Sequence, residues 1–337
     1  MIKTKIIKHS LPILFIDTFF FIDFVGNRHR KTKSHYFAEE LELIDLVLKL
    51  TKEKKLLCPE GDQEEEYHLG VKYEEELRKE QAQLSHGIRA MYHYGVYKFQ
   101  LQQAMIACLK NQKIVEYDYR SLFEGDPLKE LEKALSHPYI ISVHIPLPKS
   151  FLNKQRKTKE ELAKDFERLR KENINSGTRF KDQVKREVLG KLDAIINTLK
   201  TVVPKLTQQQ SLTQAEINGL QVFADYLAYL SHYAKKEVTI KEVADFIKSD
   251  YYASIPYISV ESKLYASLLT QQNSVKESDN FDFHQTSQML PFCTYFLTDS
   301  SLKHRITTNP LKLDEEYRVK VFSMKEIRNL ILELQKL

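Results

Sequence analysis

Two apolar segments of this sequence end on an aspartate. "ILFID" ends at Asp17 and "YFLTD" ends at Asp299, and their Ile, Leu and Phe residues are typical of strands that are covered on both faces. An unpaired carboxylate is costly inside such a core, so we expect each Asp at the carboxyl end of its strand. Parallel strands in one sheet would bring both side chains to the edge where open α/β sheets bind ligands.

Further carboxylates are expected at the same edge. Asp282 lies at the start of a predicted helix that precedes the second strand, and the acidic cluster "DQEEEY" follows the apolar segment "KLLCP". Carboxylates that converge repel one another unless a cation lies between them, and Mg²⁺ or Mn²⁺ suits an all-oxygen site. Such a site activates a water and neutralises charge on a phosphate, which is the chemistry of metal-dependent nucleases.

The elements that would position these residues lie at the two ends of the chain. Residues 11–66 predict a strand over 12–16, a helix over 37–52 and a strand over 55–58. From residue 281 onward the pattern predicts helices and strands in alternation. The predicted elements are a helix over 281–290, a strand over 293–298, a helix over 300–306, a strand over 317–323 and a final helix over 324–337.

Between the two ends, the pattern is almost purely helical. Capping boxes of the form T-x-x-E are predicted at Thr158, Thr213 and Thr239, each before a periodic apolar run. The segment 137–148 is bracketed by prolines and is expected to be an edge strand or an extended connector. We therefore expect one split domain, formed by residues 1–66 and 281–337, that is interrupted by a helical insertion over 67–280.

The order of these motifs resembles that of the PIN-domain nucleases and their PIN-like relatives. "DTFF" after the first strand is similar to the family's opening motif, and "DFHQTSQMLPFCTYFLTDSSL" is similar to its later acidic segment. The resemblance covers roughly a third of the chain. It implies an α/β PIN-like three-layer fold with a central parallel sheet, interrupted here by the large, mainly helical insertion.

The resemblance also implies a set of site residues. Catalytic and metal-binding roles fall on Asp17, Glu66, Asp282 and Asp299, with Glu65 as the rival to Glu66. Further candidates are Thr18, Thr298 and His284.

The activity that the resemblance implies is hydrolysis of single-stranded RNA by an endoribonuclease that uses Mg²⁺ or Mn²⁺. Stand-alone proteins of this kind often act as toxin-like or phage-defence effectors, so a regulatory protein partner is a further hypothesis. Two alternatives stay open. One is a structure-specific DNA nuclease, and the other is a non-catalytic PIN-like interaction protein that has lost its metal.

The basic residues are concentrated in the middle of the chain. The formal net charge is +5, but residues 149–205 alone carry 16 Lys and Arg against 8 Asp and Glu. This stretch is a candidate footprint for a phosphate backbone, with a solvated helical arm as the alternative. The segment "GNRHRKTK" is read as a basic loop in the same way, and its candidate nucleic-acid contacts are Arg28, Arg30, Lys31 and Lys33.

Composition indicates a folded protein that does not cross a membrane. With 337 residues, 42% of them hydrophobic, the chain can bury a substantial core. Three widely spaced cysteines suggest neither a disulfide framework nor a zinc cluster, so a reducing cytoplasm fits best. Asp17 and Asp23 interrupt the apolar N-terminal run, which is shorter than the roughly 20 residues that span a bilayer. The oligomeric state is open.

Overall fold

The computed structural model describes residues 2–63, 66–67, 72–137, 149–272 and 274–337. Most of these residues lie in helices, and the strands form two small parallel sheets, so the architecture is a mixed α/β one. Among the described residues, no helix is both long enough and apolar enough to cross a membrane.

A three-stranded sheet joins the two ends of the chain. β2 (Leu14–Ile16), β4 (Tyr295–Leu297) and β5 (Lys320–Phe322) pair in the order β2-β4-β5, and both pairings are parallel. The predicted parallel arrangement of the two strands that precede Asp17 and Asp299 is therefore confirmed. The predicted strand at 55–58 is reduced to a single bridge beside β2.

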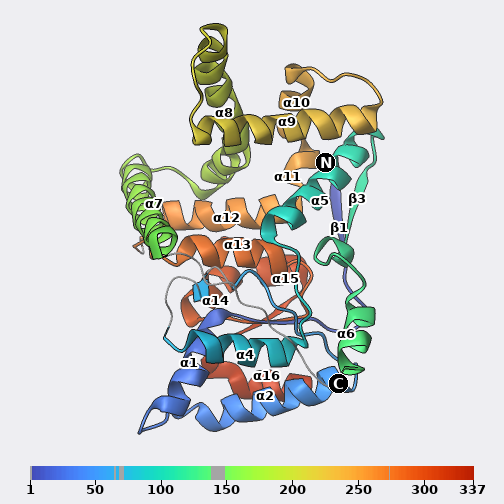
Figure 1. Cartoon of the computed structure of the whole chain (residues 1–337), viewed down its shortest axis with the longest axis vertical. Helices are drawn as coiled ribbons and strands as arrows, with labels where there is room; N and C mark the ends of the chain where they lie inside the picture. Colours follow the sequence, from blue (N-terminus) through green and yellow to red (C-terminus); the bar gives the residue numbers. More distant parts are fainter. Residues whose placement is uncertain (1, 64–65, 68–71, 138–148, 273) are drawn as a thin grey trace.

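Helices cover both faces of this sheet. Alternate strand residues point to opposite sides, and those of β2 and β4 are buried on both sides. Leu14, Ile16 and Leu297 belong to one apolar core, whereas Phe15 and Phe296 belong to the other. The first core is shared with α1 (Thr18–His29), α2 (Phe37–Lys52), α4 (Glu74–Ser85) and α16 (Ile327–Leu334), which form the lower part of the molecule in Figure 1. A 3₁₀ turn, η2 (Met324–Glu326), precedes α16 and carries a capping box.

The second core lies between the sheet and the larger helical part of the molecule. Buried residues of β2, β4 and β5 join there with those of the helices around them. These helices are α5 (His93–Leu109), α12 (Pro256–Thr270), α13 (Asp279–Met289), α14 (Ser300–Thr307) and α15 (Leu313–Tyr317).

The helix that follows Asp17 was not predicted from the sequence. α1 begins at Thr18, and its buried residues include Phe20, Phe21, Phe24 and Val25. These positions recur at helical spacing and face the first core, so packing overrides the preference of Phe for strands. The basic segment 26–33 is in consequence not simply a loop, because its first four residues belong to α1.

The helical stretch also contains a strand that the sequence reading missed. β3 (Ile114–Asp118) pairs in parallel with β1 (Lys3–Ile7), which was likewise unpredicted. The buried residues Val115 and Tyr117 alternate with exposed ones, as expected of a strand with one covered face. β3 is followed by η1 (Tyr119–Ser121) and α6 (Pro127–Leu135).

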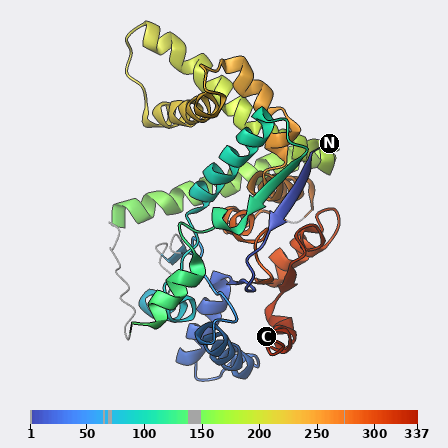
Figure 2. The same ribbon diagram turned by 90° about the vertical axis from the view of Figure 1, so that its right-hand side faces the viewer.

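The remaining helices form an arm that extends from α12 to the other end of the molecule. They are α7 (Lys149–Asn175), α8 (Phe180–Thr207), α9 (Gln214–Ala234), α10 (Ile240–Ile247) and α11 (Asp250–Ala253). In Figures 1 and 2, α8, α9 and α10 lie at the opposite end from α1 and α2, and α7 runs beside α12.

The predicted capping boxes have two outcomes. Those at Thr213 and Thr239 are present at the starts of α9 and α10. The one at Thr158 was wrong, since this residue lies inside α7, where the helix already extends before it. The predicted connector at 137–148 lies outside the described residues except for its first position.

Candidate active site

The carboxyl ends of β2 and β4 place Asp17 and Asp299 at one edge of the sheet. Ile16 is paired with Leu297, and the Asp17 amide donates to the Leu297 carbonyl at 3.0 Å. A helix begins directly after each aspartate: α1 after Asp17 and α14 after Asp299. The edge is therefore formed by two strand ends and two helix N-termini, an arrangement that favours negative charge.

Asp299 and Asp17 use their carboxylates differently. Asp299 caps α14, because its Oδ1 accepts from the amides of Ser301 at 2.7 Å and Leu302 at 3.3 Å. Asp17 occupies the equivalent position before α1, but its side chain makes no capping hydrogen bond. Its Oδ2 instead accepts from the Thr298 hydroxyl at 2.6 Å. Thr298, one of the further candidates, thus orients a carboxylate that does not serve as a helix cap.

Asp17 is held in an unfavourable electrostatic environment. The residue is only 7% exposed. Burial, and then the negative charges of Glu66 and Asp299, raise the pKa of Asp17 from 3.8 to about 7, against the opposing hydrogen bond from Thr298. A raised pKa means that the fold disfavours the ionised form of this carboxylate.

Asp282 belongs to the same electrostatic cluster. It lies in the first turn of α13, an element that packs on α12 and α5 rather than on α1. Burial raises the pKa of Asp282 well above its ordinary value, and Asp17, Glu66 and Asp299 raise it further. All four carboxylates that the sequence singled out are therefore brought close enough to repel one another.

Glu66 is positioned by a glutamine that the sequence reading did not single out. The buried side chain of Gln63 donates from Nε2 to the carbonyl of Ile16 at 2.5 Å, at the carboxyl end of β2. The Glu66 amide then donates to the Gln63 carbonyl at 3.0 Å. Gln63 so attaches the acidic segment to the sheet edge. Glu65, the rival ligand, lies outside the described residues.

A buried arginine next to the acidic cluster was also missed. Arg305 is 7% exposed on α14, and its Nη1 is buried without a hydrogen-bond partner among the described residues. Burial lowers the pKa of Arg305, whereas the charges of Asp279, Asp282 and Asp299 raise it. A guanidinium stays charged in proteins, so this group is a fixed cation facing the carboxylates.

A sequence signal for Arg305 exists. Leu302, Arg305 and Ile306 are the buried residues of α14, and their spacing of three and four places the arginine on the apolar stripe of that helix. A charged residue on an apolar stripe is a reason to look for a buried partner.

The remaining candidates lie in other settings. Thr18 is buried at the start of α1, and its Oγ1 has no hydrogen-bond partner among the described residues. His284 is 2.9 Å from the Tyr257 hydroxyl and 3.3 Å from a Glu261 oxygen, both through Nδ1, and its ring stacks on that of His93. These contacts hold His284 against α12 and α5, and they are contacts that stabilise the packing of these helices.

The basic candidates after α1 largely serve the fold. Arg28 pairs with Glu80 at 2.5 Å and Arg30 with Asp23 at 3.2 Å. The Lys33 ammonium donates to the last carbonyls of α1 at 2.6 and 2.8 Å, which suits the negative end of a helix. For Lys31, no ion pair or side-chain hydrogen bond is found among the described residues. The assignment of this segment to nucleic acid stays a prediction.

The donor set has the chemistry of a site for a hard divalent cation. All four groups are carboxylates, and burial together with the neighbouring negative charges raises the pKa values of Asp17 and Asp282. Among the described residues, no group of three or more His, Cys, Asp or Glu side chains is arranged so that it could hold a metal ion. A cation would therefore have to draw these carboxylates closer together.

Comparison with known proteins adds nothing to these observations. No family model matches the chain, and no curated protein or solved structure shows significant similarity to it. The arguments for a function thus rest on the residues and their arrangement.

Proposed function

We propose that this chain is a metal-dependent endoribonuclease with a PIN-like core, and that Asp17, Glu66, Asp282 and Asp299 form its active site. One observation carries the proposal. Four carboxylates from three separate segments of the chain interact in the fold, and they were singled out by the order of their motifs. A buried cluster of like charges lowers the stability of the fold. Such clusters are therefore found mainly at functional sites.

The four carboxylates would hold Mg²⁺ or Mn²⁺, and these ions, when bound, supply Lewis acidity toward a phosphodiester and its attacking water. The chain's own groups set the geometry. Thr298 fixes the orientation of Asp17, the first turn of α14 fixes Asp299, and Gln63 fixes the segment of Glu66. Rigid supports of this kind keep an active site in its productive arrangement.

Arg305 gives the proposed site a permanent positive charge. It lies beside Asp282 and Asp299 and is held over the Phe283 ring, with its guanidinium carbon 5.3 Å from the ring centroid. A fixed cation at this place would stabilise the negative charge that develops on a phosphate during hydrolysis. Its buried position also means that it cannot turn away to solvent.

The test is a cleavage assay on labelled single-stranded RNA and single-stranded DNA in Mn²⁺, Mg²⁺ or EDTA. Wild type is compared with Asp17→Asn and Asp299→Asn. Asp126→Asn is the matched control, because Asp126 caps α6 as Asp299 caps α14, by accepting from a backbone amide at 3.1 Å. We expect RNA cleavage that needs a metal, falls at least a hundredfold in the two site variants, and persists in the control.

Three results would contradict the proposal in different ways. Cleavage of DNA in preference to RNA would support the structure-specific DNA nuclease. Cleavage that survives both site variants would move the active site elsewhere. No cleavage by folded protein, together with no heat of Mn²⁺ binding, would support the non-catalytic PIN-like protein. A regulatory partner for the nuclease stays a prediction.

A further inference from the structure

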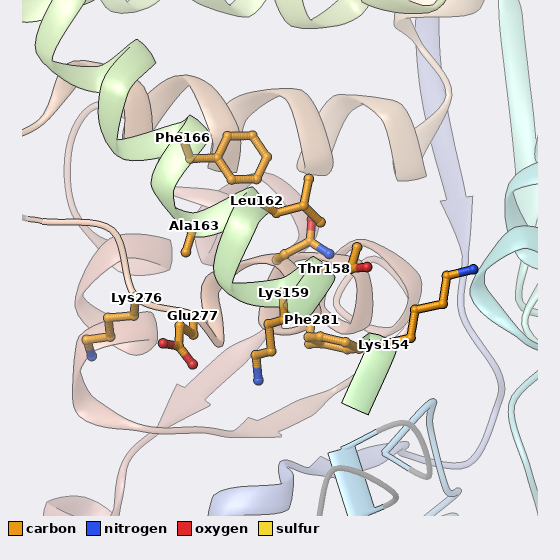
Figure 3. A pocket seen from close by; sticks show the side chains of 10 residues that line it. Lys154, Thr158, Lys159, Leu162, Ala163, Phe166, Lys276, Glu277 and Phe281 are labelled. Carbon is orange, nitrogen blue, oxygen red and sulfur yellow. The ribbon is translucent and has the colours of Figure 1, made fainter. Parts of the chain in front are cut away.

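A pocket of about 330 Å³ lies between α7 and the start of α13, as shown in Figure 3. Its volume falls within the range of small-ligand sites. One wall is a face of α7, and the other is formed by the residues that lead into α13 and by its first turn. Phe281 lines the pocket, and the next residue along α13 is Asp282, one of the four proposed active-site carboxylates.

The walls of the pocket are apolar and aromatic. Leu162 and Phe166 come from α7, and Phe281 comes from α13. Phe166 stacks on Tyr265 of α12 at a ring distance of 5.2 Å, which holds it in place. Leu162 is 39% exposed, although it belongs to the side of α7 that faces this pocket. The pocket thus offers flat apolar surface that the fold itself leaves partly uncovered.

Three lysines surround these walls. Lys154 and Lys159 come from α7, and Lys276 precedes α13; Figure 3 shows their side chains extending to different sides of the pocket. Among the described residues, none of the three forms an ion pair with a carboxylate, in contrast to Lys157 and Lys171 of the same helix. One acidic residue, Glu277, also lines the pocket, so the lining carries a net positive charge.

A contact already present shows how the charges and the rings are combined. The Lys159 ammonium lies 4.9 Å from the centroid of the Phe281 ring. Cations over aromatic faces are a regular feature of proteins that bind single-stranded nucleic acid, where bases stack on rings and phosphates meet lysines. Asn280 and Thr158 add polar groups that could hydrogen-bond the edge of a base.

We propose that this pocket binds an unpaired nucleobase of single-stranded RNA, and that Lys154, Lys159 and Lys276 contact the phosphates on either side of it. The inference deepens the proposed function, on which it rests, because it places a substrate-binding site one residue along α13 from Asp282. It also gives the basic helical arm a role in binding the strand that the carboxylates would cut.

The argument for this occupant is complementarity of shape and charge. A base presents two flat apolar faces and is flanked by negative phosphates, and the pocket presents apolar side chains within a positive rim. A duplex keeps its bases stacked inside and cannot fill the pocket. The site therefore selects for single strands by its form.

The test is binding of a fluorescein-labelled ten-nucleotide oligouridylate, followed by fluorescence anisotropy in EDTA, so that no cleavage can occur. The first variant replaces the three pocket lysines together by alanine. The matched control replaces three exposed lysines of α8, Lys185, Lys191 and Lys200, for which no ion pair is found among the described residues. Thermal unfolding checks that both variants fold.

We expect the pocket variant to bind at least tenfold more weakly and to show a shallower dependence on salt, by about 2 in the slope of log K against log salt if three phosphate contacts are lost. The control should lose at most a fewfold in affinity. Phe281→Ala should weaken binding about tenfold and leave the salt slope unchanged, since it removes a stacking surface and no charge.

Several results would overturn the inference: equal losses in the pocket and control variants, equally tight binding of a blunt duplex, or no binding by wild type. The outcome can be separated from that of the cleavage assay. Specific loss of binding in a protein that never cleaves would uphold the pocket and contradict the nuclease. If wild type cleaves RNA and the pocket variants bind as tightly as wild type, the nuclease is upheld and the pocket is contradicted.

Discussion

Asp17→Asn should make the metal-free protein more stable at pH 8, although it removes a buried charged group. The pKa of Asp17 is raised from 3.8 to about 7 by burial and by neighbouring carboxylates. A difference of about three units, at 1.36 kcal/mol each, means that ionising Asp17 costs about 4 kcal/mol more in the folded than in the unfolded chain. Since the neighbouring carboxylates share this cost, we expect the variant to gain about 2 kcal/mol.

The sign of the pH dependence follows from the direction of the shift. A raised pKa means that the folded protein holds the proton more tightly than the unfolded chain, so the penalty is absent below pH 4. It grows as the pH rises from 4 to 7 and is constant above 7. Asn keeps an oxygen that can accept from the Thr298 hydroxyl. The difference in free energy of unfolding between the variant and wild type should therefore be smallest at pH 4, partly developed at pH 5 and largest at pH 8.

The assay is urea denaturation in EDTA at pH 5, 6, 7 and 8, with Asp126→Asn as the control. Because Asn caps a helix about as well as Asp, this exposed control should change the free energy of unfolding by less than about 0.5 kcal/mol at every pH in this range. A second set of titrations adds Mn²⁺ at pH 7. The free energy of unfolding of wild type should rise by about 2.7 kcal/mol once the Mn²⁺ concentration exceeds the dissociation constant a hundredfold, and that of Asp17→Asn should rise by less. If Asp17→Asn is destabilised equally at every pH, then Asp17 is an ordinary structural residue and the reasoning fails.

Three further predictions concern single side chains. Glu40→Gln should raise the free energy of unfolding by about 1–3 kcal/mol at pH 8 and by little at pH 5, because burial raises the pKa of Glu40 to about 7. Asn27 can still donate to the new amide oxygen. Urea denaturation at both pH values tests this prediction. Thr298→Val should lower stability by about 1–2 kcal/mol above pH 7 and raise the pKa of Asp17 further, and equal losses at pH 5 and 8 would contradict this. Arg170→Ala should cost about 2 kcal/mol in thermal unfolding and weaken oligouridylate binding, because its guanidinium holds α7 to two backbone carbonyls after α12; unchanged binding would show that α7 stays in place without it.

The acidic edge of the sheet could be predicted because its signals are local. An apolar run that stops at an aspartate marks a strand end, and two such runs predict neighbouring parallel strands, as β2 and β4 are. The helix α2 was equally readable from its apolar spacing. α1 was missed because Phe and Ile favour strands in isolation, and only the core beneath it shows that Phe20, Phe21 and Phe24 share a helical face.

The pocket and the buried arginine could not be read in this way. The pocket brings α7 against residues 276–281, more than a hundred positions later, and this approach depends on contacts such as those of Arg170. Likewise β1 pairs with β3 across more than a hundred residues, and β1 is largely exposed, so neither strand carries a strong local signal. Long-range placement of this kind is decided by packing in three dimensions, which periodicity does not encode.

The arrangement of Asp17 also bears on the choice between a catalyst and a scaffold. The residue stands where a carboxylate could cap α1, yet its side chain does not do so and lies among other carboxylates instead. Asn at the same position could accept the Thr298 hydrogen bond without adding to the repulsion. A protein that only needed this fold would be stabilised by that exchange at Asp17 or at Asp282. Both charges are expected in a buried cluster where a bound cation offsets their repulsion. An Asp17→Asn variant that is more stable than wild type but is no longer stabilised by Mn²⁺ would therefore support a metal site.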